Sequence, residues 1–159
     1  MESLATGGTC MEKLEELRIQ EKVQSLFDSG WNCCEAVVKT VCEEMGIDPE
    51  IPVKIASPLG SGMSKNGATC GALNGAFICF GLFNGRTAAD GDREPSYGPA
   101  DLTFTRFVEK YGSFKCKDLT GLDFRNPDVM ALNKPRLHKE ICGPMVQKIV
   151  IWVMESLKK

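Results

Sequence analysis

The sequence contains a single histidine, His138, and no CxxC pair, although cysteine is abundant. One histidine excludes most histidine-rich metal sites, and we expect His138 to be a packing or helix-surface residue. Without CxxC, the thioredoxin motif and the usual zinc-knuckle spacing are excluded. Covalent c-type haem attachment is also excluded, because it requires a CxxCH sequence.

The chain also lacks an excess of basic residues and a long apolar run. Nineteen Lys and Arg oppose twenty-one Asp and Glu, which gives a net charge of -2, so we expect no nucleic-acid partner. The best apolar candidate, residues 145–154, contains Lys148 and is too short to span a membrane. Residues 1–16 are acidic and lack an apolar secretory core, so we expect a cytoplasmic protein without a membrane partner.

The glycine-rich residues 60–67 do not form a nucleotide-binding motif. Gly60-Ser61-Gly62 begins like a dinucleotide fingerprint, but Lys65 occupies the third glycine position and no strand precedes it. The spacing of residues 62–67 suits a phosphate loop, yet an alanine follows where the lysine is required. We therefore expect no bound nucleotide.

The apolar pattern predicts an all-α fold in one domain, residues 1–159, with residues 1–12 loosely ordered. Apolar residues recur at helical spacing, and no segment alternates convincingly as a strand does. Helices are predicted over residues 10–27, 32–45, 70–83, 101–113 and from 136 or 143 to 157, with a short helical piece at 50–58. Loops are predicted at 60–67, 84–100 and 119–135. The expected architecture is a compact bundle of about five helices.

Residues 70–83 are apolar almost all round and belong at the centre of that bundle. Small residues, Gly75 among them, share one face of this helix and allow another helix to approach closely. We therefore expect Gly75 to lie against a neighbouring helix.

The eight cysteines fall into two kinds of setting. They are about 5% of the chain, below the roughly 8–10% of a small disulfide scaffold. Cys34, Cys42 and Cys79 lie on apolar stripes and are expected to pack as small hydrophobes, while Cys10 lies near a terminus. Of the remaining four, Cys33, Cys70 and Cys142 lie at helix ends or breaks, and Cys116 lies in a connection just past the end of a helix.

Helix ends favour reactive thiols. A helix N-terminus offers free amide hydrogens and about half a positive charge, and lysines flank Cys116. Both effects stabilise a thiolate, which is the nucleophile and the metal ligand. We therefore expect Cys33 or Cys70 to have a pKa below the ordinary value of about 8.5.

The spacing of these motifs resembles one known family. Asn32-Cys33-x-Glu35-Ala36-Val37, Gly60-x-Gly62-Met63 with Gly67, Cys70-Gly71-Ala72-x-x-Gly75-Ala76, Cys116 and Cys142 follow one another as in the C_GCAxxG_C_C family, which is described as redox-active. The resemblance covers about residues 20–150 and places the family's signature cysteines on Cys33, Cys70, Cys116 and Cys142. It implies redox activity but little about the substrate. The cysteine-rich part of split-Soret-type cytochromes is similar, which points towards an iron–sulfur cluster without haem.

Three functions remain open at this point. In the first, the four cysteines converge on an iron–sulfur cluster, or less favourably zinc, and transfer electrons; Gly62, Gly67 and Gly71 let the backbone approach the cofactor. In the second, the same thiols act as a dithiol–disulfide oxidoreductase without metal. In the third, the chain is a helical interaction module whose cysteines only pack. A redox partner protein of unknown identity is expected for the first two, and a homodimer is left open.

Overall fold

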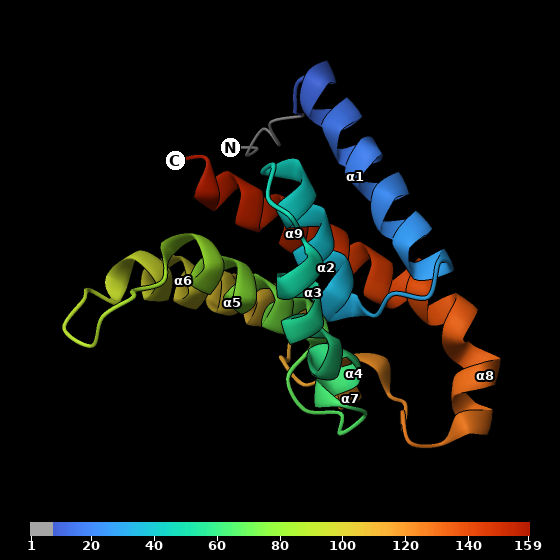
Figure 1. Cartoon of the computed structure of the whole chain (residues 1–159). Coiled ribbons are helices and arrows are strands. Elements are labelled where there is room, and N and C mark those ends of the chain that lie inside the picture. Colours follow the sequence, from blue (N-terminus) through green and yellow to red (C-terminus); the bar gives the residue numbers. More distant parts are fainter. Residues whose placement is uncertain (1–7) are drawn as a thin grey trace, which may run out of the picture.

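The computed structural model describes residues 8–159 and is all-α, as predicted (Figure 1). The helices are α1 (Cys10–Asp28), α2 (Cys33–Glu44), α3 (Glu50–Ala56), α4 (Gly60–Met63), α5 (Gly71–Asn84), α6 (Glu94–Tyr111), α7 (Cys116–Thr120), α8 (Pro127–Arg136) and α9 (Gly143–Leu157). A 3-10 turn, Ser57–Leu59, joins α3 to α4, and a π-helical turn, Leu137–Cys142, joins α8 to α9. Residues 10–12 form the first turn of α1, whereas residues 1–7 lie outside the described part.

None of the helices between residues 8 and 159 combines the length and the apolar character that crossing a membrane requires.

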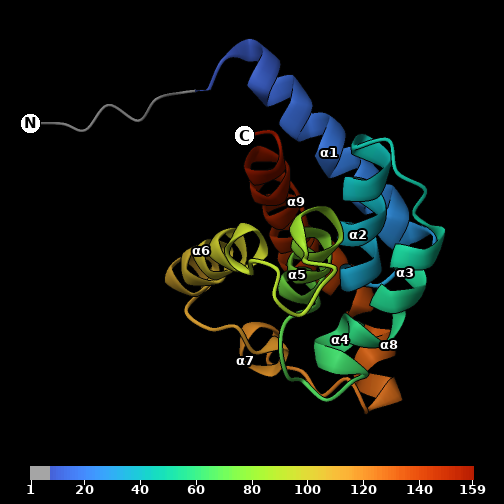
Figure 2. The ribbon, with the colours of Figure 1, turned by 60° about the vertical axis from the view of Figure 1, so that its left-hand side comes forward.

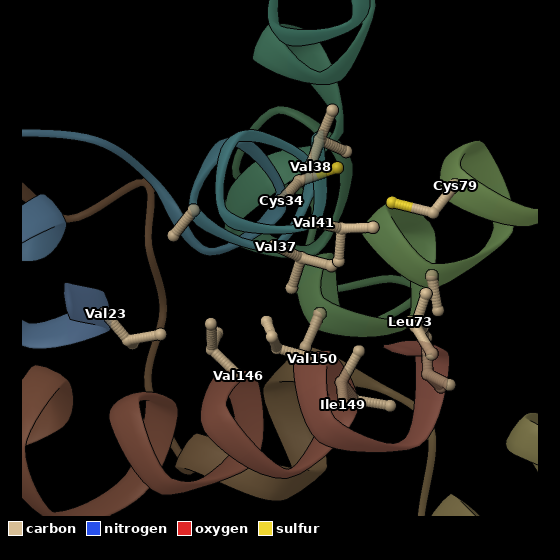
Figure 3. Close-up of a cluster of buried hydrophobic side chains, with 14 of the residues drawn as sticks. Val23, Cys34, Val37, Val38, Val41, Leu73, Cys79, Val146, Ile149 and Val150 are labelled. Atoms are coloured by element: carbon tan, nitrogen blue, oxygen red, sulfur yellow. The ribbon is translucent and has the colours of Figure 1, made fainter. Parts of the chain in front are cut away.

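The core lies where α2, α5 and α9 meet, with α1 covering α2 and α9 (Figure 3). Figure 3 shows side chains from all four helices converging, and the labelled ones are Val23, Cys34, Val37, Val38, Val41, Leu73, Cys79, Val146, Ile149 and Val150. A Cβ on Gly75 would lie 2.6 Å from the Cβ of Val37. The close approach of α2 to α5 therefore depends on the missing side chain, and the prediction for Gly75 is confirmed.

Three segments predicted to be loops contain helical turns, and the first is residues 60–67, where the turn α4 lies. The prediction for residues 84–100 is wrong from Glu94 onward, because α6 begins there and includes Pro95 and Pro99. The prediction for residues 119–135 is wrong because it contains α8, which begins at Pro127 and has Pro135 next to its end. Pro95 and Pro127 stand in the first turn of their helices, where a proline removes only an N–H that has no partner anyway, so these two prolines are compatible with a helix.

The turn α4 and the short helix α7 lie together at the end of the bundle away from the C-terminus, and α8 lies at the same end (Figures 1 and 2). The N-terminal ends of α2 and α5 are directed to this same end. It holds the candidate site.

Candidate functional site

Each of the four signature cysteines stands at the beginning or the break of a helix. Cys33 is the first residue of α2, which begins with a capping box. In this box the Asn32 side chain accepts from the backbone N–H of Glu35 at 2.9 Å, and the Glu35 carboxylate accepts from the N–H of Asn32 at 2.8 Å. The Asn32 side chain also donates to the carbonyl of Ser57, at 3.0 Å. These bonds fix the end of α2 against the segment before α4.

Cys70 and Cys116 are placed next to one another by a short antiparallel pairing. The N–H of Cys116 donates to the carbonyl of Ala68 at 2.7 Å, and the N–H of Cys70 donates to that of Phe114 at 2.8 Å. Cys70 is the residue before α5, as predicted, but Cys116 begins α7 rather than lying in an irregular connection. The pairing joins two cysteines that are far apart in the sequence.

Cys142 ends the π-helical turn that precedes α9. In this turn the N–H of Gly143 donates to the carbonyl of His138, one residue farther back than in an α-helix. Such insertions are common at functional sites because they redirect the side chains around them. The turn brings Cys142 to the same end of the bundle as the other three.

All four cysteines line one cavity of about 390 Å³. Cys70 and Cys116 are buried, with exposed fractions of 7% and 5%, whereas Cys33 and Cys142 are partly exposed. Cys33 acts on the pKa of each of the other three through its charge, which places it centrally in the group. The structure therefore brings the four predicted site residues together, although their chemical roles stay predictions.

The turn α4 is built from left-handed backbone. Residues 61–65 all have positive φ, between 54° and 70°, and only Gly62 among them is a glycine. The left-handed conformation costs roughly 1–2 kcal/mol for each ordinary residue. The turn directs the backbone N–H of Ser61 at the Cys33 sulfur. Strain of this kind concentrates at functional sites, where the surrounding structure maintains it.

Burial raises the pKa of all four thiols. It raises the pKa of Cys70 and of Cys116 to about 12, and it raises the pKa of Cys33 and of Cys142 as well. Backbone N–H groups of Ser61 and Gly71 oppose this at Cys33, but desolvation of the thiolate is the larger effect. The prediction that Cys33 or Cys70 has a pKa below the ordinary value is therefore wrong. The sequence indicated that these cysteines lie at helix ends, but it did not indicate how deeply their thiols are buried.

The three predicted cofactor-binding glycines have different surroundings. A Cβ on Gly71 would overlap the Cys33 sulfur, and one on Gly62 would lie 2.7 Å from the Cβ of Cys116. A Cβ on Gly67 would instead lie 3.0 Å from the Cβ of Lys117. Two of the three thus let the backbone approach the cysteines, and Gly67 supports α7 from outside the cavity.

In residues 8–159, no three His, Cys, Asp or Glu side chains are close enough together to hold a metal ion. Four thiolates are a donor set that suits an iron–sulfur cluster or zinc. Their present arrangement, however, does not form a ligand shell for a single ion.

The remaining cysteines behave as the apolar pattern indicates. Cys34, Cys42 and Cys79 are completely buried in the core, and Cys10 is exposed. Burial raises the pKa of each of the three core thiols. They are packing residues, separate from the cavity.

Sequence reasoning missed most of the other cavity residues. His138, predicted to be a packing residue, stacks on Phe27 with ring centroids 4.4 Å apart and also lines the cavity. Three basic side chains, Lys65, Arg125 and Lys134, line it too, and come from segments predicted to be irregular. No sequence signal joined these positions, because neither α8 nor the left-handed turn was predicted.

Comparison with known families gives one match. The family described as "Putative redox-active protein (C_GCAxxG_C_C)" matches residues 31–156, which include all four cavity cysteines. Searches of curated proteins and of solved structures found no match. Because the match covers most of the chain, the protein belongs to the C_GCAxxG_C_C family.

Proposed function

We propose that the protein transfers two electrons by thiol–disulfide exchange within the four-cysteine cavity. The observation that carries this proposal is the convergence of four thiols from distant segments on one cavity, with no metal-ligand group of three among the described residues. Membership of a family described as redox-active supports redox chemistry but does not identify the reaction.

Cys33 is the best candidate for the attacking thiol. Backbone N–H groups of Ser61 and Gly71 face its sulfur. They favour attack, since exchange proceeds through a thiolate and these groups stabilise one. Cys70 is the best resolving thiol, because the chain at Gly71, the next residue, passes so close to the Cys33 sulfur that a Cβ there would overlap it.

The exchange proceeds in two balanced steps. The Cys33 thiolate attacks one sulfur of a substrate disulfide, the substrate S–S bond breaks, and one substrate thiolate leaves. The Cys70 thiolate then attacks the Cys33 sulfur in the mixed disulfide and releases the second substrate thiolate. The two leaving groups take up the protons that the cysteines lost, so two thiols and a substrate disulfide yield two substrate thiols and a Cys33–Cys70 disulfide.

The raised pKa values favour the electron-donating direction. A dithiol protein is a strong oxidant when its reduced form is stabilised, and its reduction potential can then be as high as about -120 mV. Without that stabilisation it acts as a reductant, as thioredoxin does at a reduction potential of about -270 mV. Burial destabilises the thiolates of Cys33 and Cys70 more than the backbone N–H groups stabilise them. We therefore expect a reduction potential closer to the thioredoxin value.

The test is disulfide mapping after oxidation of the reduced chain with 2,2′-dithiodipyridine, in a Cys10→Ser background that removes the exposed thiol. We expect release of two pyridinethione molecules per chain and a Cys33–Cys70 disulfide found by mass spectrometry. Cys70→Ser should abolish the second release and Cys33→Ser should abolish both, whereas Cys42→Ser should preserve both. Stable mixed disulfides without an internal bridge would overturn the proposal.

An iron–sulfur cluster is a second candidate, favoured by the four-cysteine donor set and by backbone N–H groups that face the Cys33 and Cys70 sulfurs. Cys33, Cys70, Cys116 and Cys142 would hold it, and it would supply one-electron transfer. The test is the visible absorption of anaerobically purified protein, with iron and sulfide counted. A brown protein with stoichiometric iron supports the cluster, and a colourless iron-free protein supports thiol exchange.

A further inference from the structure

The cavity combines its thiols with a basic rim. Lys65 is the last of the left-handed residues 61–65, Arg125 precedes α8 and Lys134 lies within α8. All three line the cavity with exposed side chains. Asp and Glu are absent from its lining, as far as residues 8–159 are concerned. None of the three cations forms a salt bridge within the described part of the chain.

The position of the rim is fixed by the fold. The Arg125 guanidinium donates a hydrogen bond to the side-chain oxygen of Asn66, the residue after Lys65. This bond links the left-handed turn to the segment before α8 across 59 residues of sequence. Lys65 and Arg125 therefore belong to neighbouring segments of the cavity rim, where one anion can pair with both side chains.

The inner wall is apolar and the volume is small. Trp31, Phe124, Met130, Leu137 and Met145 line the cavity beside the cysteines. A volume of about 390 Å³ is at the lower end of the roughly 300–1,000 Å³ typical of small-molecule sites. A molecule that enters completely is thus a small one, with an apolar body and negative charge.

We infer that the cavity binds a low-molecular-weight, carboxylate-bearing disulfide, whose carboxylates pair with Lys65, Arg125 and Lys134 while its sulfurs reach Cys33. This inference deepens the proposed thiol-exchange function and rests on it for the choice of a disulfide. The exchange itself follows the two steps given above. The basic rim supplies recognition, and it also attracts the anion before contact.

The first test compares two disulfides of different charge. Reduced protein in the Cys10→Ser background is reacted with 5,5′-dithiobis(2-nitrobenzoate), which is a dianion, and with neutral 2,2′-dithiodipyridine. In the rim variant Lys65→Gln/Arg125→Gln/Lys134→Gln, we expect the rate constant for the dianion to fall about tenfold or more. The rate constant for the neutral disulfide should change less than about twofold, because no rim charge attracts it.

A matched control separates local recognition from net charge. Lys13→Gln/Lys110→Gln/Lys159→Gln removes the same charge at positions that do not line the cavity, and it should leave both rates near those of the parent. Equal slowing of the dianion in both triple variants, or no slowing in the rim variant, would overturn the inference.

The second test needs no thiol chemistry. Binding of 4-nitrobenzoate to the reduced protein is followed by quenching of tryptophan fluorescence, because Trp31 lines the cavity, with 4-nitrobenzamide as the neutral probe. We expect the carboxylate to bind more tightly than the amide and to lose this preference in the rim variant; equal binding of the two probes overturns the inference. If carboxylate binding is selective but no disulfide exchange occurs, the anion site stands and the proposed function fails.

Discussion

Cys33 and Cys34 are neighbours in the sequence and lie in two different regions of the molecule. Cys34 is completely buried between α2 and α5, where small and β-branched side chains fill the space (Figure 3). Cys33 is partly exposed and lines a cavity whose wall includes left-handed backbone. Successive side chains on a helix point about 100° apart, so the Cys34 thiol lies in the core while the Cys33 thiol, one residue earlier in α2, lies at the cavity.

The two regions keep their shape by different means. The core relies on close contact, as between Gly75 and Val37, and its helices have regular backbone. The cavity end relies on hydrogen bonds between irregular segments, such as those of Cys70 and Cys116 with the backbone opposite. We infer that the core holds the fold and that the strain is confined to the end that carries the thiols.

The largest effect is expected from Gly75→Leu. A Cβ there already lies 2.6 Å from Val37 and 3.1 Å from the carbonyl oxygen of Cys34, so a leucine must push α2 away from α5. We expect the free energy of unfolding to fall by about 3 kcal/mol, measured by urea denaturation. The matched control in the same helix is Gly81→Leu, because Gly81 has open space beside it. That variant should be as stable as the wild type or up to about 1 kcal/mol more stable, and equal losses in the two variants would contradict the close approach.

The second effect distinguishes a core cysteine from a cavity cysteine. Cys79→Ser places a hydroxyl in a fully buried apolar position, which should lower the free energy of unfolding by about 2 kcal/mol. Cys142→Ser places it at a cavity surface, where water can bind it, and should cost less than about 1 kcal/mol. Thermal unfolding of the two variants measures the difference. Equal costs would mean that the cavity is as closely packed as the core.

The sequence predicted best those features of the two regions that depend on residues close together in the chain. The helices α2 and α9 were predictable, because helix periodicity depends on residues within a few positions. The left-handed turn was not, because Ser61, Met63 and Ser64 adopt positive φ only through their surroundings. The signature cysteines were found from helix ends and family spacing, whereas the direction of their pKa shifts depends on burial and was predicted wrongly.

A third effect concerns charges far from the cavity rim. Glu44 of α2 accepts from Arg18 of α1 at 2.7 Å and from Lys22 at 3.0 Å, and its pKa is lowered from 4.5 to about 2, chiefly by the bond from Arg18. A lowered pKa in the folded state stabilises the protein above pH 4.5, and this stabilisation is lost as the pH falls towards 2. Because Arg18 is half exposed, we expect Glu44→Gln to cost only about 1 kcal/mol at pH 7.

The measurement for Glu44→Gln is urea unfolding of the variant and the wild type between pH 7 and pH 2.5. The difference between them should shrink as the pH falls below 4.5, since the wild-type carboxylate becomes protonated. A rim variant such as Lys134→Gln should show no such loss at pH 7, because Lys134 has no salt bridge among the described residues. A constant difference for Glu44→Gln across the pH range would contradict the ion pairs.

The smallest change in the free energy of unfolding is expected from Met63→Gly, and this change should be a gain in stability. Met63 has φ of 64° and an exposed side chain, so it loses little packing when truncated. Glycine adopts positive φ without the steric cost of a side chain, but it also gains freedom in the unfolded chain. The relief of roughly 1–2 kcal/mol should exceed the entropic loss of about 0.5–1 kcal/mol, so we expect a net gain of about 0.5 kcal/mol in the free energy of unfolding.

The matched control for Met63→Gly is Leu132→Gly, at a more exposed position inside the regular helix α8. Glycine in a helix interior is unfavourable, so this variant should lose about 1 kcal/mol. Urea unfolding measures the change in the free energy of unfolding for each variant. A gain for Met63→Gly together with a loss for Leu132→Gly would show that the backbone strain lies in the turn that faces Cys33 and not in the helices around it. A loss of stability in both variants would mean that the left-handed turn costs less than its φ values imply, and strain would then play no part in forming the site.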